Sequence, residues 1–182
     1  MSYKRWIFIA TFLFGIGLGF GLATPAGTSL PSEYIAALEE QISSLLALPK
    51  LLIVMLIFVK NVSVLLISFI FSPLLCLVPI LSLTANGWLI AVISTAVIKE
   101  ESLAFLLAGL LPHGIFELPA LILGQAAALS FGTIAILALV KKERRNLLLP
   151  SLKQNLRYLI IACALLLPAA IIETYITPLL LT

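Results

Sequence analysis

The sequence predicts an all-α protein, a polytopic bundle of transmembrane helices that forms a single domain over residues 1–182. Apolar residues make up 62% of the chain and charged residues only 10%, whereas a soluble domain carries about 25% charged residues. The apolar residues lie in long runs, and a helix of about 20 such residues crosses a bilayer. We expect about five spans, one broken or re-entrant helix and one amphipathic surface helix.

The first predicted span covers residues 1–23. Its basic start, apolar centre and small residues are also typical of a signal peptide, but we interpret the segment as an uncleaved span. Four glycines within it form two overlapping G-x-x-x-G pairs, a pattern that lets another helix approach closely. They are Gly15, Gly17, Gly19 and Gly21.

The amphipathic helix is expected at residues 32–48. Ile35, Leu38, Ile42 and Leu45 recur there at helical spacing, between polar and acidic residues. A helix with one apolar face lies on the membrane surface or covers the bundle.

Residues 51–98 are almost unbroken apolar sequence, which is enough for two spans. Ser72 and Pro73 predict the turn between them, and Pro79 predicts a kink in the second span. Residues 103–140 are long for one span and short for two. We therefore expect a half-helix, a break at Pro112–Gly114 and then a full span.

The segment 141–157 is predicted to be a basic cytoplasmic loop, because it carries six basic residues and one acidic residue. Basic loops stay on the cytoplasmic side of a membrane. With Lys4 and Arg5 on that side too, the N-terminus is expected in the cytoplasm, and the last span, 158–180, puts the C-terminus outside. The protein is thus a multi-pass protein of the cell membrane.

Polar residues inside the spans are candidates for a functional site. A charged side chain in mid-bilayer costs about 2.5–3.5 kcal/mol, so such residues face the bundle interior and find partners. His113 and Glu117 are four residues apart, which places them on one helix face. We expect one shared polar intramembrane site, open if at all to the outside. Its candidate residues are Lys60, Asn61, Asn86, His113, Glu117, Gln125 and Glu173.

Three motifs resemble the stage II sporulation protein M family: "LPHGIFELPA", the preceding "NG", and the closing "IETYITP". The resemblance runs from about Phe58 to Pro178. It implies a helical membrane fold and, in the namesake, a scaffold role that anchors cell-wall-degrading partners during engulfment. The motif positions with an implied structural role are Gly87, Pro112, Gly114, Pro119 and Pro178.

Three functions are compatible with this sequence, of which the first is favoured and the other two are alternatives. The first is a membrane scaffold or assembly partner, in which a buried His/Glu network fixes helix register. The second is a small transporter or lipid-handling protein, because a broken helix with ionisable residues is typical of transporters. The third is an intramembrane metal-dependent hydrolase. An enzyme is the less favoured reading, since the chain has one histidine and no aspartate.

No cofactor is expected, and no metal either; if a metal binds, His113, Glu117 and Glu173 are its ligands. The expected partners are the lipid bilayer and membrane or cell-envelope proteins. A homo-oligomer is left open by the G-x-x-x-G pairs. Nucleic acid is not expected, because the basic residues gather in one short loop between apolar spans.

Overall fold

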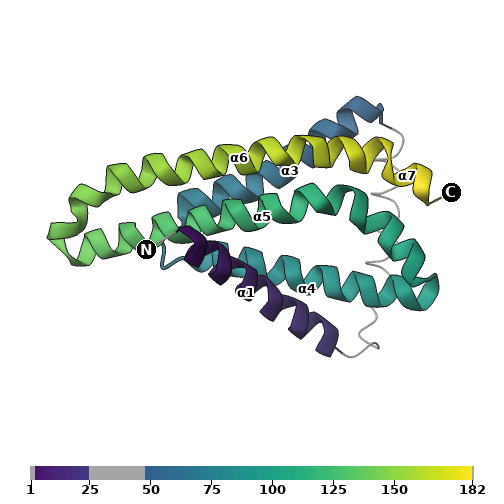
Figure 1. Cartoon of the computed structure of the whole chain (residues 1–182), viewed down its shortest axis with the longest axis horizontal. Helices are drawn as coiled ribbons and strands as arrows, with labels where there is room; N and C mark the ends of the chain where they lie inside the picture. Colours follow the sequence, from purple (N-terminus) through teal and green to yellow (C-terminus); the bar gives the residue numbers. More distant parts are fainter. Residues whose placement is uncertain (1–2, 25–47, 182) are drawn as a thin grey trace.

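The computed structural model describes residues 3–24 and 48–181, and every regular element within them is a helix. The all-α prediction is therefore confirmed for this part of the chain, whereas the amphipathic helix predicted at 32–48 lies almost wholly outside the described residues. The elements (Figure 1) are α1 (Tyr3–Ala23), α3 (Lys50–Phe71), α4 (Leu77–Glu100), α5 (Leu103–Val140), the 3-10 helix η1 (Lys142–Leu147), α6 (Leu148–Tyr175) and α7 (Thr177–Leu180).

Five segments are long and apolar enough to cross a membrane, by length and composition: α1, α3, α4, α5, and Lys142–Tyr175, which holds η1 and α6. The most extensive contacts join α5 with α6 and α1 with α4. Figure 1 shows α5 and α6 running side by side, with α1 and α4 crossing below them. The prediction of a multi-pass membrane protein with five spans is confirmed.

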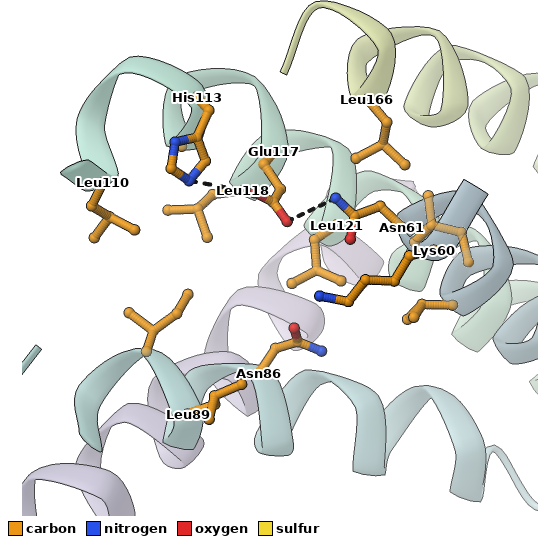
Figure 2. A pocket seen from close by; sticks show the side chains of 14 residues that line it. Lys60, Asn61, Asn86, Leu89, Leu110, His113, Glu117, Leu118, Leu121 and Leu166 are labelled. Carbon is orange, nitrogen blue, oxygen red and sulfur yellow. Dashed lines mark hydrogen bonds and ion pairs between the residues drawn. The ribbon is translucent and has the colours of Figure 1, made fainter. Parts of the chain in front are cut away.

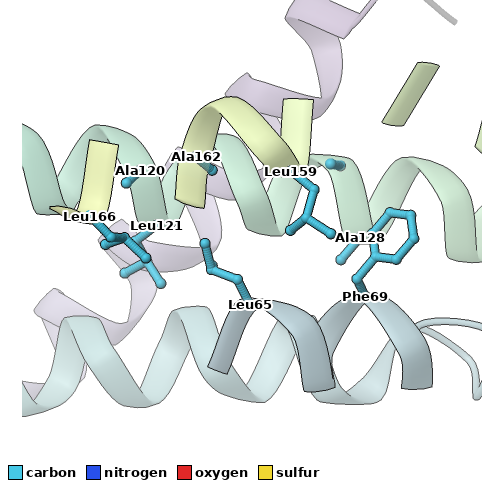
Figure 3. Close-up of a cluster of buried hydrophobic side chains, with 9 residues drawn as sticks. Leu65, Phe69, Ala120, Leu121, Ala128, Leu159, Ala162 and Leu166 are labelled. Carbon is cyan, nitrogen blue, oxygen red and sulfur yellow. The ribbon is translucent and has the colours of Figure 1, made fainter. Parts of the chain in front are cut away.

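The helix α5 belongs to both hydrophobic clusters of the bundle. Small residues such as Ala126, Ala127 and Ala128 are fully buried there, and small side chains let membrane helices pack closely. The first cluster (Figure 3) joins α3, α5 and α6 through Leu65, Phe69, Ala120, Leu121, Ala127, Ala128, Leu159, Ala162 and Leu166. The second joins α1, α4 and α5 through Trp6, Ala10, Cys76, Leu83, Ala126 and Leu129.

Glycines hold α1 against α4. A Cβ atom at Gly17 or Gly21 would overlap the backbone of α4, and one at Gly87 would overlap the backbone of α1. Gly15 and Gly19 differ, because a Cβ there would meet nothing within 4 Å among the described residues. Among the described residues a close helix approach is therefore found at Gly17 and Gly21 but not at Gly15 and Gly19.

The turn predicted at Ser72 and Pro73 is confirmed, since α3 ends at Phe71 and α4 begins at Leu77. Pro79 is the third residue of α4 and Pro150 the third residue of α6. A proline in a first turn removes no hydrogen bond from its own helix. Pro79 therefore gives no reason to expect a kink in α4.

Two predicted boundaries are wrong. The expected break at Pro112–Gly114 is absent, because α5 continues as one helix from Leu103 to Val140 with both Pro112 and Pro119 inside it. The chain bends there instead: Figure 1 shows a sharp bend in the first third of α5, and interior prolines cause such bends. The basic loop is also shorter than 141–157, because α6 already begins at Leu148 and carries Lys153 and Arg157.

Candidate functional site

A cavity of about 210 Å³ lies between α3, α4 and α5 (Figure 2). Its wall is largely apolar, with leucines from all three helices and one from α6. Five polar side chains also line it, and each was singled out from the sequence. They are Lys60 and Asn61 from α3, Asn86 from α4, and His113 and Glu117 from α5.

His113 and Glu117 lie one turn apart on α5 and approach each other on the cavity wall. The His113 Nε2 and Glu117 Oε2 atoms are 3.8 Å apart, and the two side chains are 14% and 32% exposed. They lie just after Pro112, on the bent part of α5. The bend thus determines the direction in which this pair faces, and both side chains are reachable from the cavity.

Each member of the pair has a second contact from a distant part of the chain. The Asn61 amide donates a hydrogen bond from Nδ2 to Glu117 Oε1 at 3.1 Å. Thr177 Oγ1 lies 3.5 Å from His113 Nδ1 and donates to the Ile172 carbonyl at 3.3 Å. The motif pair on α5 is therefore held from α3 on one side and from the α6–α7 junction on the other.

Glu173 on α6 completes the group. One ligand atom each from His113, Glu117 and Glu173 all lie within 4.8 Å of one another, and the three side chains are half-buried. The sequence placed these residues in one site, and the structure brings them together.

Lys60 and Asn86 complete the polar lining of the cavity. In Figure 2 Asn86 lies on the side opposite His113 and Glu117, and the Lys60 side chain reaches from α3 into the space between Glu117 and Asn86. Asn86 donates from Nδ2 to the Ser82 carbonyl of its own helix at 2.7 Å. Within the described residues Lys60 forms no ion pair shorter than 4.0 Å, and its side chain lines the cavity.

Gln125 does not belong to this site, which corrects the expectation of one shared polar cluster. It is completely buried and donates from Nε2 to Ser68 Oγ at 3.0 Å and to Ser82 Oγ at 2.8 Å. Eight residues of helix, about 12 Å, separate it from Glu117. Ser68 and Ser82 were not predicted as partners of Gln125. The available signal was that all three polar residues lie inside apolar runs and therefore need polar partners there.

The remaining motif residues shape the backbone around the site. Gly114 is buried and lines the cavity, but a Cβ there would reach only the Leu110 side chain, at 4.0 Å, so close helix approach is not its role. Pro119 is exposed on α5. Pro178 stands in the first turn of α7, beside Thr177.

Five helices long and apolar enough to span a membrane, with ionisable side chains on the wall of a cavity between three of them, define a polytopic helical membrane protein. The family model described as Stage II sporulation protein M matches residues 8–178, almost the whole chain. The protein belongs to the stage II sporulation protein M family.

One curated relative is an uncharacterized protein of Methanocaldococcus jannaschii, which is 32% identical over 99 residues. The match covers 54% of this chain and 56% of the relative, so the alignment spans only about half of that protein's length. No solved structure matches this chain.

Proposed function

We propose that the protein binds a small polar solute, or the polar headgroup of a lipid, in the cavity between α3, α4 and α5, and moves it within or across the membrane. The observation that carries this proposal is a cavity inside a transmembrane bundle whose largely apolar wall carries five polar side chains. Ionisable residues at membrane depth are costly and mark ion or substrate pathways when they face a cavity. His113 and Glu117 do so with 14% and 32% of their side chains exposed.

The size and charge of the cavity restrict the ligand. A volume of about 210 Å³ corresponds to about seven water molecules at roughly 30 Å³ each. Lys60 supplies a positive charge from α3, and Glu117 a negative charge from α5. A small molecule or headgroup that carries both charges matches this arrangement, because each of its charges would meet an opposite one.

Reconstitution in liposomes tests the proposal. Uptake of small zwitterionic solutes and exchange of a labelled zwitterionic phospholipid between leaflets would be measured for the wild type and for Glu117→Gln and Lys60→Gln. The matched controls are Glu143→Gln and Lys142→Gln, whose side chains are exposed on η1. We expect both cavity variants to lose at least ten-fold in rate and both controls to keep it. Rates equal to empty liposomes, or unchanged in Glu117→Gln, would overturn the proposal.

A scaffold is the second candidate, and the buried contacts of Gln125 favour it. This side chain links α5 to α3 and α4 through Ser68 and Ser82, and buried polar groups of this kind fix helix register. In this reading the protein assembles membrane or cell-envelope proteins, or copies of itself. Cross-linking in native membranes would then recover the same partners from the wild type and from Glu117→Gln, and loss of those partners only in the cavity variant would count against it.

The orientation of the bundle is part of the proposal. Lys4 and Arg5 on α1 and the four basic residues at 141–145 are exposed, and basic segments stay in the cytoplasm. Tyr3 and Tyr158 stack with ring centroids 3.5 Å apart, and tyrosines gather at membrane–water boundaries. The N-terminus and η1 would therefore be cytoplasmic, with the C-terminus outside.

A further inference from the structure

The contacts around His113 indicate which of its ring nitrogens carries the proton. Thr177 Oγ1 uses its own proton to bond the Ile172 carbonyl, so toward His113 it accepts. The Nδ1 atom, 3.5 Å from that oxygen, is then the N–H donor. The lone pair of a neutral ring therefore stands on Nε2, the atom that faces Glu117 at 3.8 Å.

Glu117 is oriented in the same manner. Its Oε1 atom accepts the Asn61 amide at 3.1 Å, which leaves Oε2 for the His113 side. The Asn61 donor on α3 and the Thr177 acceptor at the α6–α7 junction thus hold two side chains of α5 so that their free lone pairs converge. Partners of this type, which bond the far side of a histidine or carboxylate, are typical of metal ligands.

The approach of Glu117 and Glu173 to each other and to His113 places two negative charges side by side. Two carboxylates, Glu117 and Glu173, and one ring nitrogen of His113 lie within 4.8 Å of one another inside an apolar bundle. Like charges held this close repel strongly where water is scarce. Lys60 is the only lysine or arginine that lines the cavity, and among the described residues it pairs with neither glutamate. A cation between the three side chains would remove the repulsion.

We propose that His113, Glu117 and Glu173 bind one divalent transition-metal cation, with Zn²⁺ as the simplest fit. Nitrogen and carboxylate oxygen ligands lie about 2.0–2.2 Å from Zn²⁺, so ligands of a shared ion are at most about 4.4 Å apart. The three atoms already lie within 4.8 Å, and side-chain shifts of a few tenths of an ångström would close the site.

The proposed site has three protein ligands, as catalytic and substrate-binding zinc sites do, which leaves a position open on the metal. His113 and Glu117 line the cavity, so a water molecule or a phosphate or carboxylate oxygen of a ligand there could fill that position. The metal site does not depend on the transport proposed above, since metal binding is measured without any solute or lipid flux.

Metal analysis of the full chain, purified in detergent, tests the site. After removal of metals with a chelator, Zn²⁺ would be titrated by calorimetry and its content measured by mass spectrometry. We expect one Zn²⁺ per chain and at least a ten-fold weaker affinity in Glu173→Gln and in His113→Gln, with no change in the matched control Glu143→Gln. Absence of stoichiometric binding, or full affinity in Glu173→Gln, would mean that a shared proton and not a metal lies between the residues.

Two further measurements keep the test decisive if a ligand variant does not fold. X-ray absorption of the zinc-loaded wild type should show nitrogen and oxygen ligands alone, whereas sulfur would assign the metal to Cys76 or Cys163. Thr177→Val removes the contact that orients His113 but keeps the side-chain size. It should weaken Zn²⁺ binding about ten-fold, the effect expected for an outer contact of a ligand, while a wild-type affinity would contradict the role given to Thr177.

Discussion

Asn61 on α3 donates a hydrogen bond to Glu117 on α5 at 3.1 Å, across 56 positions of sequence. In the described part of the chain, these two helices alone place a lysine, arginine or glutamate on the cavity wall, Lys60 on α3 and Glu117 on α5. The bond also fixes which carboxylate oxygen of Glu117 is free. The position of the candidate site therefore depends on the packing of α3 against α5.

Removal of the Asn61 amide should loosen this contact. Asn61→Ala is expected to lower the free energy of unfolding by about 1 kcal/mol, because a hydrogen bond between membrane helices contributes about 0.6–1.7 kcal/mol. Asn86→Ala is the control, since Asn86 bonds only a carbonyl of its own helix. Unfolding in mixed detergent, followed by circular dichroism, measures both; equal effects of the two substitutions would contradict the interhelical role.

The two glycine pairs of α1 should respond differently to an added methyl group. Gly17→Ala would push a Cβ into the α4 backbone, and overpacking of this kind costs about 1–3 kcal/mol. Gly15→Ala adds a methyl group where no described atom lies within 4 Å. We expect a lower melting temperature for Gly17→Ala alone, as measured by thermal unfolding in detergent. A comparable loss in Gly15→Ala would show that its face is also covered.

Gln125 should tolerate loss of its polarity better than a gain of charge. Gln125→Leu removes two hydrogen bonds, but it also removes the Oε1 atom, which is buried without a hydrogen-bond partner. The leucine leaves the Ser68 and Ser82 hydroxyls without their donor, at a cost of about 1–3 kcal/mol for a buried group that loses its partner. Gln125→Glu would instead bury a charge, at a cost of about 2.5–3.5 kcal/mol. The yield of folded protein by fluorescence-detected gel filtration should follow the order wild type, leucine, glutamate.

Pro112 should control the bend of α5. Pro112→Ala restores the missing N–H, so α5 should straighten and lose the approach of His113 to Glu173 and Thr177. Spin labels at Phe105 and Leu139, in a chain without Cys76 and Cys163, report the change, because a straight helix of 34 residues would separate them by about 51 Å. We expect a longer distance in Pro112→Ala and no change in Pro79→Ala, since Pro79 is on α4.

The orientation can be read from cysteine labelling in intact cells. With Cys76 and Cys163 replaced, Arg144→Cys should react with a membrane-impermeant maleimide only after lysis, because the basic segment is expected in the cytoplasm. Leu179→Cys, at a side chain that is 71% exposed, should react in intact cells. The reverse pattern would invert the proposed topology.

The number of spans could be predicted because hydropathy is a local property of each run. The break at Pro112 was predicted wrongly because a proline in a membrane helix can be accommodated by neighbouring helices, which compensate for the lost hydrogen bond. The start of α6 was also predicted wrongly, because the charges at 141–157 suggested a loop. A helix is compatible with Pro150 in its first turn and with Lys153 and Arg157 on its exposed face.

The candidate site was predictable as a set of residue types, but its internal contacts were not. His113 and Glu117 share a helix face by their spacing, which periodicity alone indicates. The approach of Glu173 and Thr177 depends on the register of α6 against α5, and that of Asn61 on the register of α3. The same registers exclude Gln125 from the cavity, and no local pattern in the sequence encodes them.

The presence of α5 in both hydrophobic clusters has a consequence for how the bundle comes apart. Ala127 and Ala128 belong to the first cluster and Ala126 to the second, so opening either cluster uncovers part of the same stretch of α5. Separation of α5 would therefore expose apolar surface on both the α1–α4 pair and the α3–α6 pair. We expect the two halves to be lost together, in one cooperative transition rather than in two steps.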